Sequence, residues 1–321
     1  MNIRTRVASL FSVLLALGLA SCASRGPSPS PESGVVSQDE ALKLQIFLDS
    51  QGFGVGPVDG RGGEFTAKAA VLFRQVRGLP AGSPLPTANI QPFASYTVTE
   101  QDLGALGSLP SDPEARSKQE KLPYTSLLEL LAERFHTSQQ YLQSLNTSQR
   151  INALRPGAQI IVPNVARPFR FDAFPSTYPA ASPEVGGRRQ VVVNLREKNL
   201  HVLDQGQIIA AFPITPGSPQ HPAPAGNWRV VGSVPWPWYR HDEGVLSRGQ
   251  RTDEFYNLPP GPNSPVGILW AGLNRPGVGI HGSPVPETIG RTGSHGCIRL
   301  TNWDAAIFHT LISKNTPVTI R

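Results

Sequence analysis

The chain has 321 residues, which is enough for two or three compact units. Hydrophobic residues make up 39% and charged residues 16%, as in an ordinary globular protein, and the net charge is +6. No run of Lys and Arg is dense enough to indicate a nucleic-acid partner, so a mildly basic surface is favoured, which would also suit a polyanionic polymer. The 31 glycines and 32 prolines favour loops, linkers and β structure over helical bundles.

The amino terminus has the pattern of a secretory signal. Arg4 and Arg6 precede an apolar run over residues 7–20, which is too short for a comfortable membrane span and ends in small residues. We therefore expect residues 1–21 to be a signal peptide and the protein to be exported.

A cysteine follows directly after this segment. Leu-Ala-Ser-Cys at residues 19–22 resembles a bacterial lipobox, and the resemblance implies that Cys22 carries a lipid anchor. Ordinary cleavage nearby, with an incidental cysteine, is the alternative. Because Ala23 and not Asp follows, the resemblance also implies sorting to the outer membrane, with the protein on its periplasmic face. Residues 22–34, rich in Ser, Pro and Gly, are expected to form a flexible tether.

Residues 35–80 have the pattern of two helices around a glycine-rich turn. Ser37 and Glu40 have the spacing of a capping box, and a second helix is predicted over residues 66–77. Helix, Val-Asp-Gly loop at 58–60 and helix together resemble the peptidoglycan-binding-like helical module. A small helical spacer without a ligand is the alternative.

Residues 92–165 follow a Pro-rich linker and have the pattern of a strand, two helices and a strand. The second helix is expected to begin at a capping box of Thr137 and Gln140. This βααβ order resembles a LysM domain, which implies binding to glycans that contain N-acetylglucosamine. A relic that no longer binds is the alternative. The expected elements are a strand beginning at 96–102, helices at 126–135 and 138–145, and a strand at 160–163.

After an irregular connector, residues 187–321 have a β pattern that ends in one helix. We expect a multidomain protein whose last domain is mainly β, β-sandwich-like, with a C-terminal helix. The expected strands are 190–195, 201–203, 208–215, 228–234, 266–273 and 317–320, and the expected helix is 302–313.

A long loop interrupts this β pattern at residues 235–262. It carries three aromatic residues, Trp236, Trp238 and Tyr239. Long loops in compact domains are more often functional than not, so we expect these residues to form the rim or lid of a substrate groove. Plain packing is the equal alternative.

The residues with the most chemical potential lie at 279–282 and 293–300. His281 is followed by Cys297, which is flanked by glycines and by Ser, His and Arg. Cysteine reacts as its thiolate, and an imidazole can take the proton. Glycine lets the backbone approach a carbonyl and direct N–H groups at a developing oxyanion. The alternatives are a buried core cysteine, or a zinc site of His281, His295 and Cys297.

The cysteine count also favours a reactive thiol. The chain has 2 cysteines, so lipidation of Cys22 would leave Cys297 without a disulfide partner. A free thiol in an oxidising compartment is a liability unless the protein uses it.

Ile-His-Gly at 280–282 and Ser-His-Gly-Cys-Ile-Arg-Leu at 294–300 resemble the signature of the L,D-transpeptidase (YkuD-like) catalytic domain. The similarity extends through Gly-Pro-Asn-Ser-Pro-Val-Gly at 261–267, where Ser264 stands in place of the family's usual Asn before Pro. The resemblance implies a catalytic domain over residues 187–321 that needs no metal and no cofactor.

The resemblance implies that Cys297 is the nucleophile and His281 its general base, with the Gly282 carbonyl holding the imidazole tautomer. Arg299 would order the site or meet a substrate carboxylate, and a structural salt bridge is the equal alternative. The other motif residues are expected to supply oxyanion N–H groups, shape the loop or support the site: Ser294, His295 and Gly296.

The implied reaction is acyl transfer on peptidoglycan. The thiolate would attack the carbonyl of the third residue of a tetrapeptide stem, expel D-Ala and pass the acyl group to an amine. A second stem would give a cross-link between third residues, a lysine of an outer-membrane lipoprotein would tether wall to membrane, and water would make the enzyme a carboxypeptidase. The resemblance also implies acylation of the thiol by carbapenems. The rival hypothesis is a non-catalytic, wall-anchoring lipoprotein.

Overall fold

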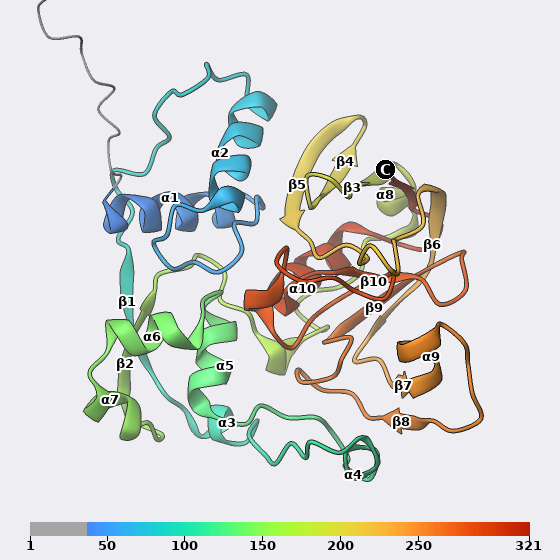
Figure 1. The fold of residues 1–321 in the computed structure, drawn as a ribbon. Helices are drawn as coiled ribbons and strands as arrows, with labels where there is room; N and C mark the ends of the chain where they lie inside the picture. The colour runs from blue at the N-terminus through green and yellow to red at the C-terminus, as the bar shows by residue number, and fades with distance from the viewer. Residues whose placement is uncertain (1–36) are drawn as a thin grey trace, which may run out of the picture. The chain divides into compact units, whose positions relative to one another are not determined.

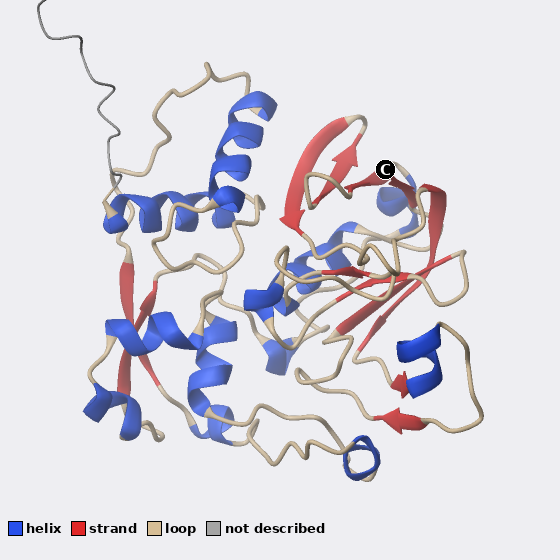
Figure 2. Cartoon of the chain, viewed as in Figure 1, coloured by secondary structure: helices blue, strands red, loops and turns tan. Residues whose placement is uncertain are grey.

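The computed structural model describes residues 37–321 (Figure 1). The predicted signal peptide, the predicted tether and Cys22 lie outside the described residues. Helices dominate the described chain before residue 187 and strands dominate after it, as the colours of Figure 2 show. Within the described residues, no helix is long and apolar enough to cross a membrane.

The first part of the described chain is mainly helical. Its elements are α1 (Gln38–Ser50), α2 (Glu64–Val76), β1 (Phe93–Thr97), α3 (Glu100–Leu103), α4 (Pro113–Ser117), α5 (Leu127–Arg134), α6 (Gln139–Leu145), α7 (Ser148–Asn152), β2 (Gln159–Pro163), the 3-10 turn η1 (Phe171–Ala173) and α8 (Pro183–Gly187).

The glycine-rich turn between α1 and α2 is fixed by a buried glutamine. The Ser37 side chain accepts from the Glu40 backbone and Glu40 reaches back, so the expected capping box is present at the start of α1. Further along that helix, Gln45 Oε1 accepts from the backbone N–H groups of Asp59 and Gly60 at 3.0 and 2.7 Å. One side chain therefore satisfies two turn donors that would otherwise be buried without partners.

The β1–β2 pair is antiparallel, with Tyr96 opposite Ile160. Two expectations in this region are wrong. The chain turns helical at α3 instead of continuing as a strand through residue 102, because Thr99 and Asp102 form a capping box. Helix α6 is capped by Ser138, and Thr137 donates to the Val58 carbonyl at 2.7 Å instead.

The second part of the chain builds an eight-stranded sheet. Its elements are β3 (Arg189–Asn194), β4 (Asn199–Asp204), β5 (Gln207–Pro213), β6 (Gly226–Pro235), β7 (Tyr239–His241), α9 (Glu243–Arg248), β8 (Tyr256–Leu258), β9 (Leu269–Leu273), β10 (Gly279–His281), the 3-10 turn η2 (Pro286–Thr288), β11 (Ile298–Arg299), α10 (Asn302–Leu311) and β12 (Pro317–Ile320).

The strand order in this sheet is β11-β10-β9-β6-β12-β3-β4-β5. The expectation of a mainly-β domain with a C-terminal helix is confirmed. The hydrogen bonds run through one continuous sheet and do not form the two separate layers of a sandwich. The ten-residue strand β6 joins the two halves of the sheet, because its residues 226–229 pair with β12 and its residues 230–235 pair with β9, with a bulge at 230–232.

Helix α10 packs against β9 over an apolar core (Figure 1). Thr301 caps this helix by accepting from the Asp304 backbone, which fixes where the chain turns from β11 into α10. Trp303, Phe308 and Ile312 are buried against the sheet. The core therefore sets the position of the sheet edge formed by β9, β10 and β11.

The stretch expected as a long loop at 235–262 is partly ordered. It contains the two-stranded β7–β8 pair and helix α9. Asp242 caps that helix and also accepts from the backbone and hydroxyl of Thr252 at 2.9 Å, so one carboxylate closes the segment on itself.

Candidate active site

The candidate site lies on one face of β9, β10 and β11. Ile280 pairs with Ala271 on one side and Ile298 on the other, and all three are fully buried in the core. Because side chains alternate along a strand, the next register pairs point to the opposite face. His281 pairs with Trp270 and Arg299 and therefore lies on that face. Cys297 is the residue that leads into β11.

His281 is buried, and its Nδ1 lies 2.7 Å from the Gly282 carbonyl oxygen. A carbonyl can only accept, so Nδ1 carries the proton and the Nε2 lone pair stays free. Burial lowers the pKa of His281 to about 4, and the Arg299 charge adds to this while the bond to Gly282 opposes it. At neutral pH the imidazole is uncharged and has a free basic nitrogen.

The Trp270 indole covers this histidine. The two rings stack with centroids 5.6 Å apart and planes 22° apart. A Cβ on Gly279 would lie 2.7 Å from the indole ring, and one on Gly272 would lie 3.1 Å from its Nε1. The two glycines make room for the indole that orients and desolvates His281. The sequence does not single out Trp270, because only the register of β9 against β10 brings its ring to His281.

The Cys297 thiol is half-buried, so it is not sealed in the core. It donates to the Gly277 carbonyl at 3.5 Å. Burial raises the pKa of the Cys297 thiol above its ordinary 9.0, while a backbone N–H of Gly279 and the Arg299 charge act to lower it. The resting thiol is therefore neutral at pH 7, and no hydrogen bond joins it to His281 within residues 37–321.

The turn before Cys297 is held by Ser294. Its hydroxyl donates to the Cys297 carbonyl and accepts from the Gly296 N–H at 3.2 Å. Gly296 has φ of 101°, a left-handed conformation that favours glycine. The backbone N–H groups of His295 and Cys297 have no acceptor in the described part of the chain. These two groups, and not that of Gly296, are free to meet an oxyanion.

Arg299 and Tyr239 both interact electrostatically with the Cys297 thiol. Burial lowers the pKa of Arg299, while Cys297 and Tyr239 raise it. Burial also raises the pKa of Tyr239, and Cys297 adds to that rise. Arg299 Nε is buried without a hydrogen-bond partner, and no salt bridge to Arg299 occurs among residues 37–321.

The three aromatic residues expected at a substrate rim lie in different surroundings. Tyr239 is half-buried, and the charge of Cys297 contributes to the rise in its pKa. Trp238 is 63% exposed. Trp236 donates to the Phe174 carbonyl at 2.9 Å and packs edge-on against that ring, which are the contacts of a packing residue.

The zinc alternative finds no support in the side-chain geometry. No group of three or more His, Cys, Asp or Glu able to hold a metal occurs in the part of the chain that the structure describes. His295 is exposed and its ring lies 5.0 Å from that of His221, while Nδ1 of His281 is bound to the Gly282 carbonyl.

Asn302 supports the loop behind His281, and sequence reasoning missed it. Its Oδ1 accepts from the Ile268 N–H at 3.2 Å, and a Cβ on Gly282 or Gly267 would lie 2.3 or 2.1 Å from the same oxygen. Its Nδ2 donates to both oxygens of Glu133 at 3.1 Å. Only glycine at position 282 lets the carbonyl that holds His281 sit against this amide.

The last part of the chain is similar to a known family of catalytic domains. Residues 188–320 match the family model described as the L,D-transpeptidase catalytic domain (YkuD). This part of the chain is therefore similar to that catalytic-domain family.

Two Bacillus proteins are similar to parts of this chain. A Bacillus licheniformis protein named as an L,D-transpeptidase, YkuD, is 25% identical over 193 residues, or 60% of this chain and 92% of that protein. The Bacillus subtilis protein of the same name is 39% identical over 71 residues, or 22% of this chain and 43% of that protein.

Two solved structures are also similar. The L,D-transpeptidase of Enterococcus faecium shares 23% identity at a TM-score of 0.33, over 42% of this chain and 50% of that one. The chain thus spans about half the length of that structure. An L,D-transpeptidase from Mycobacterium smegmatis shares 20% identity at a TM-score of 0.35, over 52% of this chain and 75% of that one.

Proposed function

We propose that the protein is a peptidoglycan L,D-transpeptidase in which Cys297 is the nucleophile and His281 the general base. The observation that carries the proposal is the tautomer of His281. Its Nδ1–H is bound to Gly282, which leaves Nε2 as a free base on the strand beside the one that Cys297 enters. An imidazole in this state can take the thiol proton as sulfur attacks a carbonyl.

In the proposed acylation, the Cys297 side chain rotates from the Gly277 carbonyl toward His281. The Sγ proton passes to Nε2 while sulfur bonds to the carbonyl carbon of the third residue of a tetrapeptide stem. The free N–H groups of His295 and Cys297 stabilise the oxyanion. The C–N bond then breaks, the imidazolium proton passes to the departing D-Ala nitrogen, and a thioester remains.

Deacylation reverses the proton path. An amine attacks the thioester, gives its proton to His281, and the Cys297 sulfur leaves and regains a proton. The amine of a second stem gives a cross-link, and a lysine of an outer-membrane lipoprotein attaches that protein to the wall. Water as acceptor makes the enzyme an L,D-carboxypeptidase, and the products separate these cases.

The test is to incubate the protein with purified disaccharide-tetrapeptide, with and without candidate amines, and to weigh protein and products. We expect release of D-Ala and a covalent adduct on Cys297, and the same thiol should be acylated by a carbapenem. Cys297→Ser should abolish both adducts, whereas Cys22→Ala, the matched cysteine control, should keep them. Persistent turnover by Cys297→Ser, or no D-Ala release by the wild type, would contradict the proposal and favour a wall-anchoring lipoprotein.

We extend the proposal to the location of the enzyme. It is exported, anchored through a lipid on Cys22 at the periplasmic face of the outer membrane, and holds wall glycan through residues 35–80 and 92–165. Deleting residues 35–163 should weaken co-sedimentation with insoluble peptidoglycan, and Cys22→Ala should abolish labelling by a radioactive fatty acid. If the protein without residues 35–163 sediments with peptidoglycan as well as the full chain does, these residues are a spacer and do not bind the wall.

A further inference from the structure

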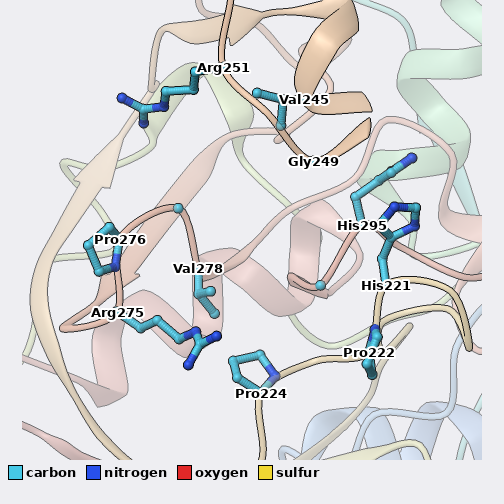
Figure 3. A pocket seen from close by; sticks show the side chains of 12 residues that line it. His221, Pro222, Pro224, Val245, Gly249, Arg251, Arg275, Pro276, Val278 and His295 are labelled. Carbon is cyan, nitrogen blue, oxygen red and sulfur yellow. The ribbon is translucent and has the colours of Figure 1, made fainter. Parts of the chain in front are cut away.

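A cavity of about 460 Å³ opens beside the nucleophile. It is lined by segments that are distant in sequence, among them the turn before β10 and the loop after α9 (Figure 3). Gly277, whose carbonyl accepts the Cys297 thiol, and Gly296, which precedes Cys297, both belong to its wall. A ligand in the cavity therefore lies next to the reacting sulfur.

The ionisable side chains that line this cavity are all basic. They include Arg251, Arg275, His221 and His295, and no carboxylate. Among residues 37–321, neither arginine takes part in a salt bridge. Two guanidinium groups without a protein counterion, in a concave site, favour an anionic ligand.

The geometry suits recognition as well as charge. The Arg275 guanidinium carbon lies 5.5 Å from the centre of the Trp228 ring, which holds the side chain while leaving its N–H groups available. In Figure 3, Arg275 points toward the middle of the cavity, and the two imidazoles lie together on the opposite wall. Their rings are 5.0 Å apart, so both can donate to one ligand.

We propose that this cavity binds free carboxylate groups of the acyl donor, so that the enzyme prefers acidic stem peptides over amidated ones. The proposal rests on the proposed function. The cavity is larger than one carboxylate needs, so it takes a carboxylate-bearing part of the peptide next to the attacked carbonyl. A carboxylate on the leaving residue and one on a side chain share this chemistry, and the test separates them.

The experiment crosses three donors with four proteins. The donors are the tetrapeptide with free carboxylates, the same peptide amidated on its side-chain carboxyl groups, and the same peptide amidated at its carboxyl terminus. The proteins are the wild type, Arg275→Gln, Arg251→Gln and Arg196→Gln. The last variant removes a charge from a side chain that is 92% exposed and outside the cavity, so it controls for net charge.

We expect Arg275→Gln to raise KM for the free donor by about tenfold or more, the size of a lost charge-assisted hydrogen bond. Amidation of the recognised carboxylate should raise KM of the wild type by a similar factor and change KM of Arg275→Gln little. The amidated donor that gives this pattern shows whether the recognised carboxylate is the terminal one or one on a side chain. Arg196→Gln should behave as the wild type. Equal losses of the Arg275 and Arg251 variants on all donors, or a wild type that is indifferent to amidation, would overturn the proposal.

A binding experiment tests the anion site independently of the proposed acyl transfer. The three peptides are titrated calorimetrically into Cys297→Ser, with and without Arg275→Gln. Weaker binding of amidated peptide to Cys297→Ser, with no further loss on Arg275→Gln, supports the anion site even if the wild type forms no acyl-enzyme. Equal affinity for all three peptides would refute it even if acyl transfer is observed.

Discussion

Burial sets the protonation states of Cys297 and His281 in the substrate-free site. Burial raises the pKa of the thiol and lowers the pKa of the imidazole to about 4. Both shifts favour the neutral form, because a charge in a poorly solvated site is costly. The resting pair is therefore thiol and imidazole, and the thiolate forms only when the proton moves to His281.

This state makes a prediction about thiol reactivity. The rate of Cys297 alkylation by iodoacetamide should rise with pH and inflect above pH 9, because the raised pKa keeps the thiol protonated below that value. Peptide mapping by mass spectrometry measures the rate at this residue alone. A fast plateau that begins below pH 7 would instead indicate a preformed thiolate–imidazolium pair.

The stacking of Trp270 on His281 depends on a missing side chain. In Gly279→Ala, the new Cβ would lie 2.7 Å from the indole ring, and the ring cannot move without leaving His281. Overpacking of this kind costs about 1–3 kcal/mol of stability. Because a displaced indole would leave His281 misoriented, we also expect kcat to fall by about tenfold or more. Steady-state release of D-Ala measures the loss.

Gly232→Ala is the matched control, since a Cβ at that position of β6 meets no atom within 4 Å. It should keep both activity and melting temperature. Full activity in Gly279→Ala would show that the indole does not orient the base.

At the scale of elements, the sequence predicts strands and caps from local patterns and misses the two strands that carry the site. Alternating apolar residues predict β3 and β4, and Ser37 predicts the first helix cap. Strands β10 and β11 span three and two residues and lie among glycines, so they have no propensity of their own. They are strands because they pair with β9 and with each other.

Contacts between distant elements were equally invisible in the sequence. The motif predicts that His281 and Cys297 act together, but nothing local connects Asn302 on α10 with Glu133 on α5. The same holds for the ring of Trp270, which reaches His281 only through strand register. Such pairs depend on tertiary packing, and a single sequence does not record it.

The α5–α10 contact predicts a pH-dependent stability. Burial raises the pKa of Glu133 to about 8 from its ordinary 4.5, and its partners Tyr124 and Asn302 act to lower it. Between these two values the folded state keeps a proton that the unfolded chain has lost, so stability falls as pH rises. Burial also raises the pKa of Asp304 on α10 to about 7, so this carboxyl likewise lowers folding stability as pH rises.

Glu133→Gln mimics the protonated carboxyl at every pH. We expect its melting temperature to match the wild type at pH 5 and to exceed it at pH 8 by roughly 2 °C or more, since 1 kcal/mol shifts a chain of this size by a few degrees. Glu120→Gln, at an exposed carboxyl, should change neither value. A variant that is less stable than the wild type at pH 8 would show that the charged carboxylate is the native form.

At the scale of the whole described chain, the front elements, which are the helices and strands before residue 187, share buried contacts with the eight-stranded sheet. Residues 37–321 belong to one compact unit. The segment after α1 lines the outer edge of β5, where Gly54 donates to the Ala211 carbonyl at 2.7 Å and Phe53 pairs beside it. This contact satisfies backbone groups that an edge strand would otherwise leave open to other chains.

A buried polar cluster joins three parts of the chain. His136, at the end of α5, stacks on Trp303 of α10 with ring centroids 5.3 Å apart. Its Nδ1 lies 3.0 Å from an Asp49 carboxylate oxygen on α1. Breaking such a contact would leave buried polar groups without partners, so the three parts should unfold together.

We therefore expect residues 37–321 to melt in one calorimetric transition, and Gly54→Val to split it. A Cβ at position 54 would lie 2.8 Å from Pro213 and 3.3 Å from the Asp304 carboxylate, which forces the segment off the edge of β5. The front elements should then melt first, several degrees below the sheet. Gly62→Val, where a Cβ meets nothing within 4 Å, should keep the single transition. Two transitions in the wild type, or an unchanged melt in Gly54→Val, would mean that the front elements and the sheet are stable independently of each other.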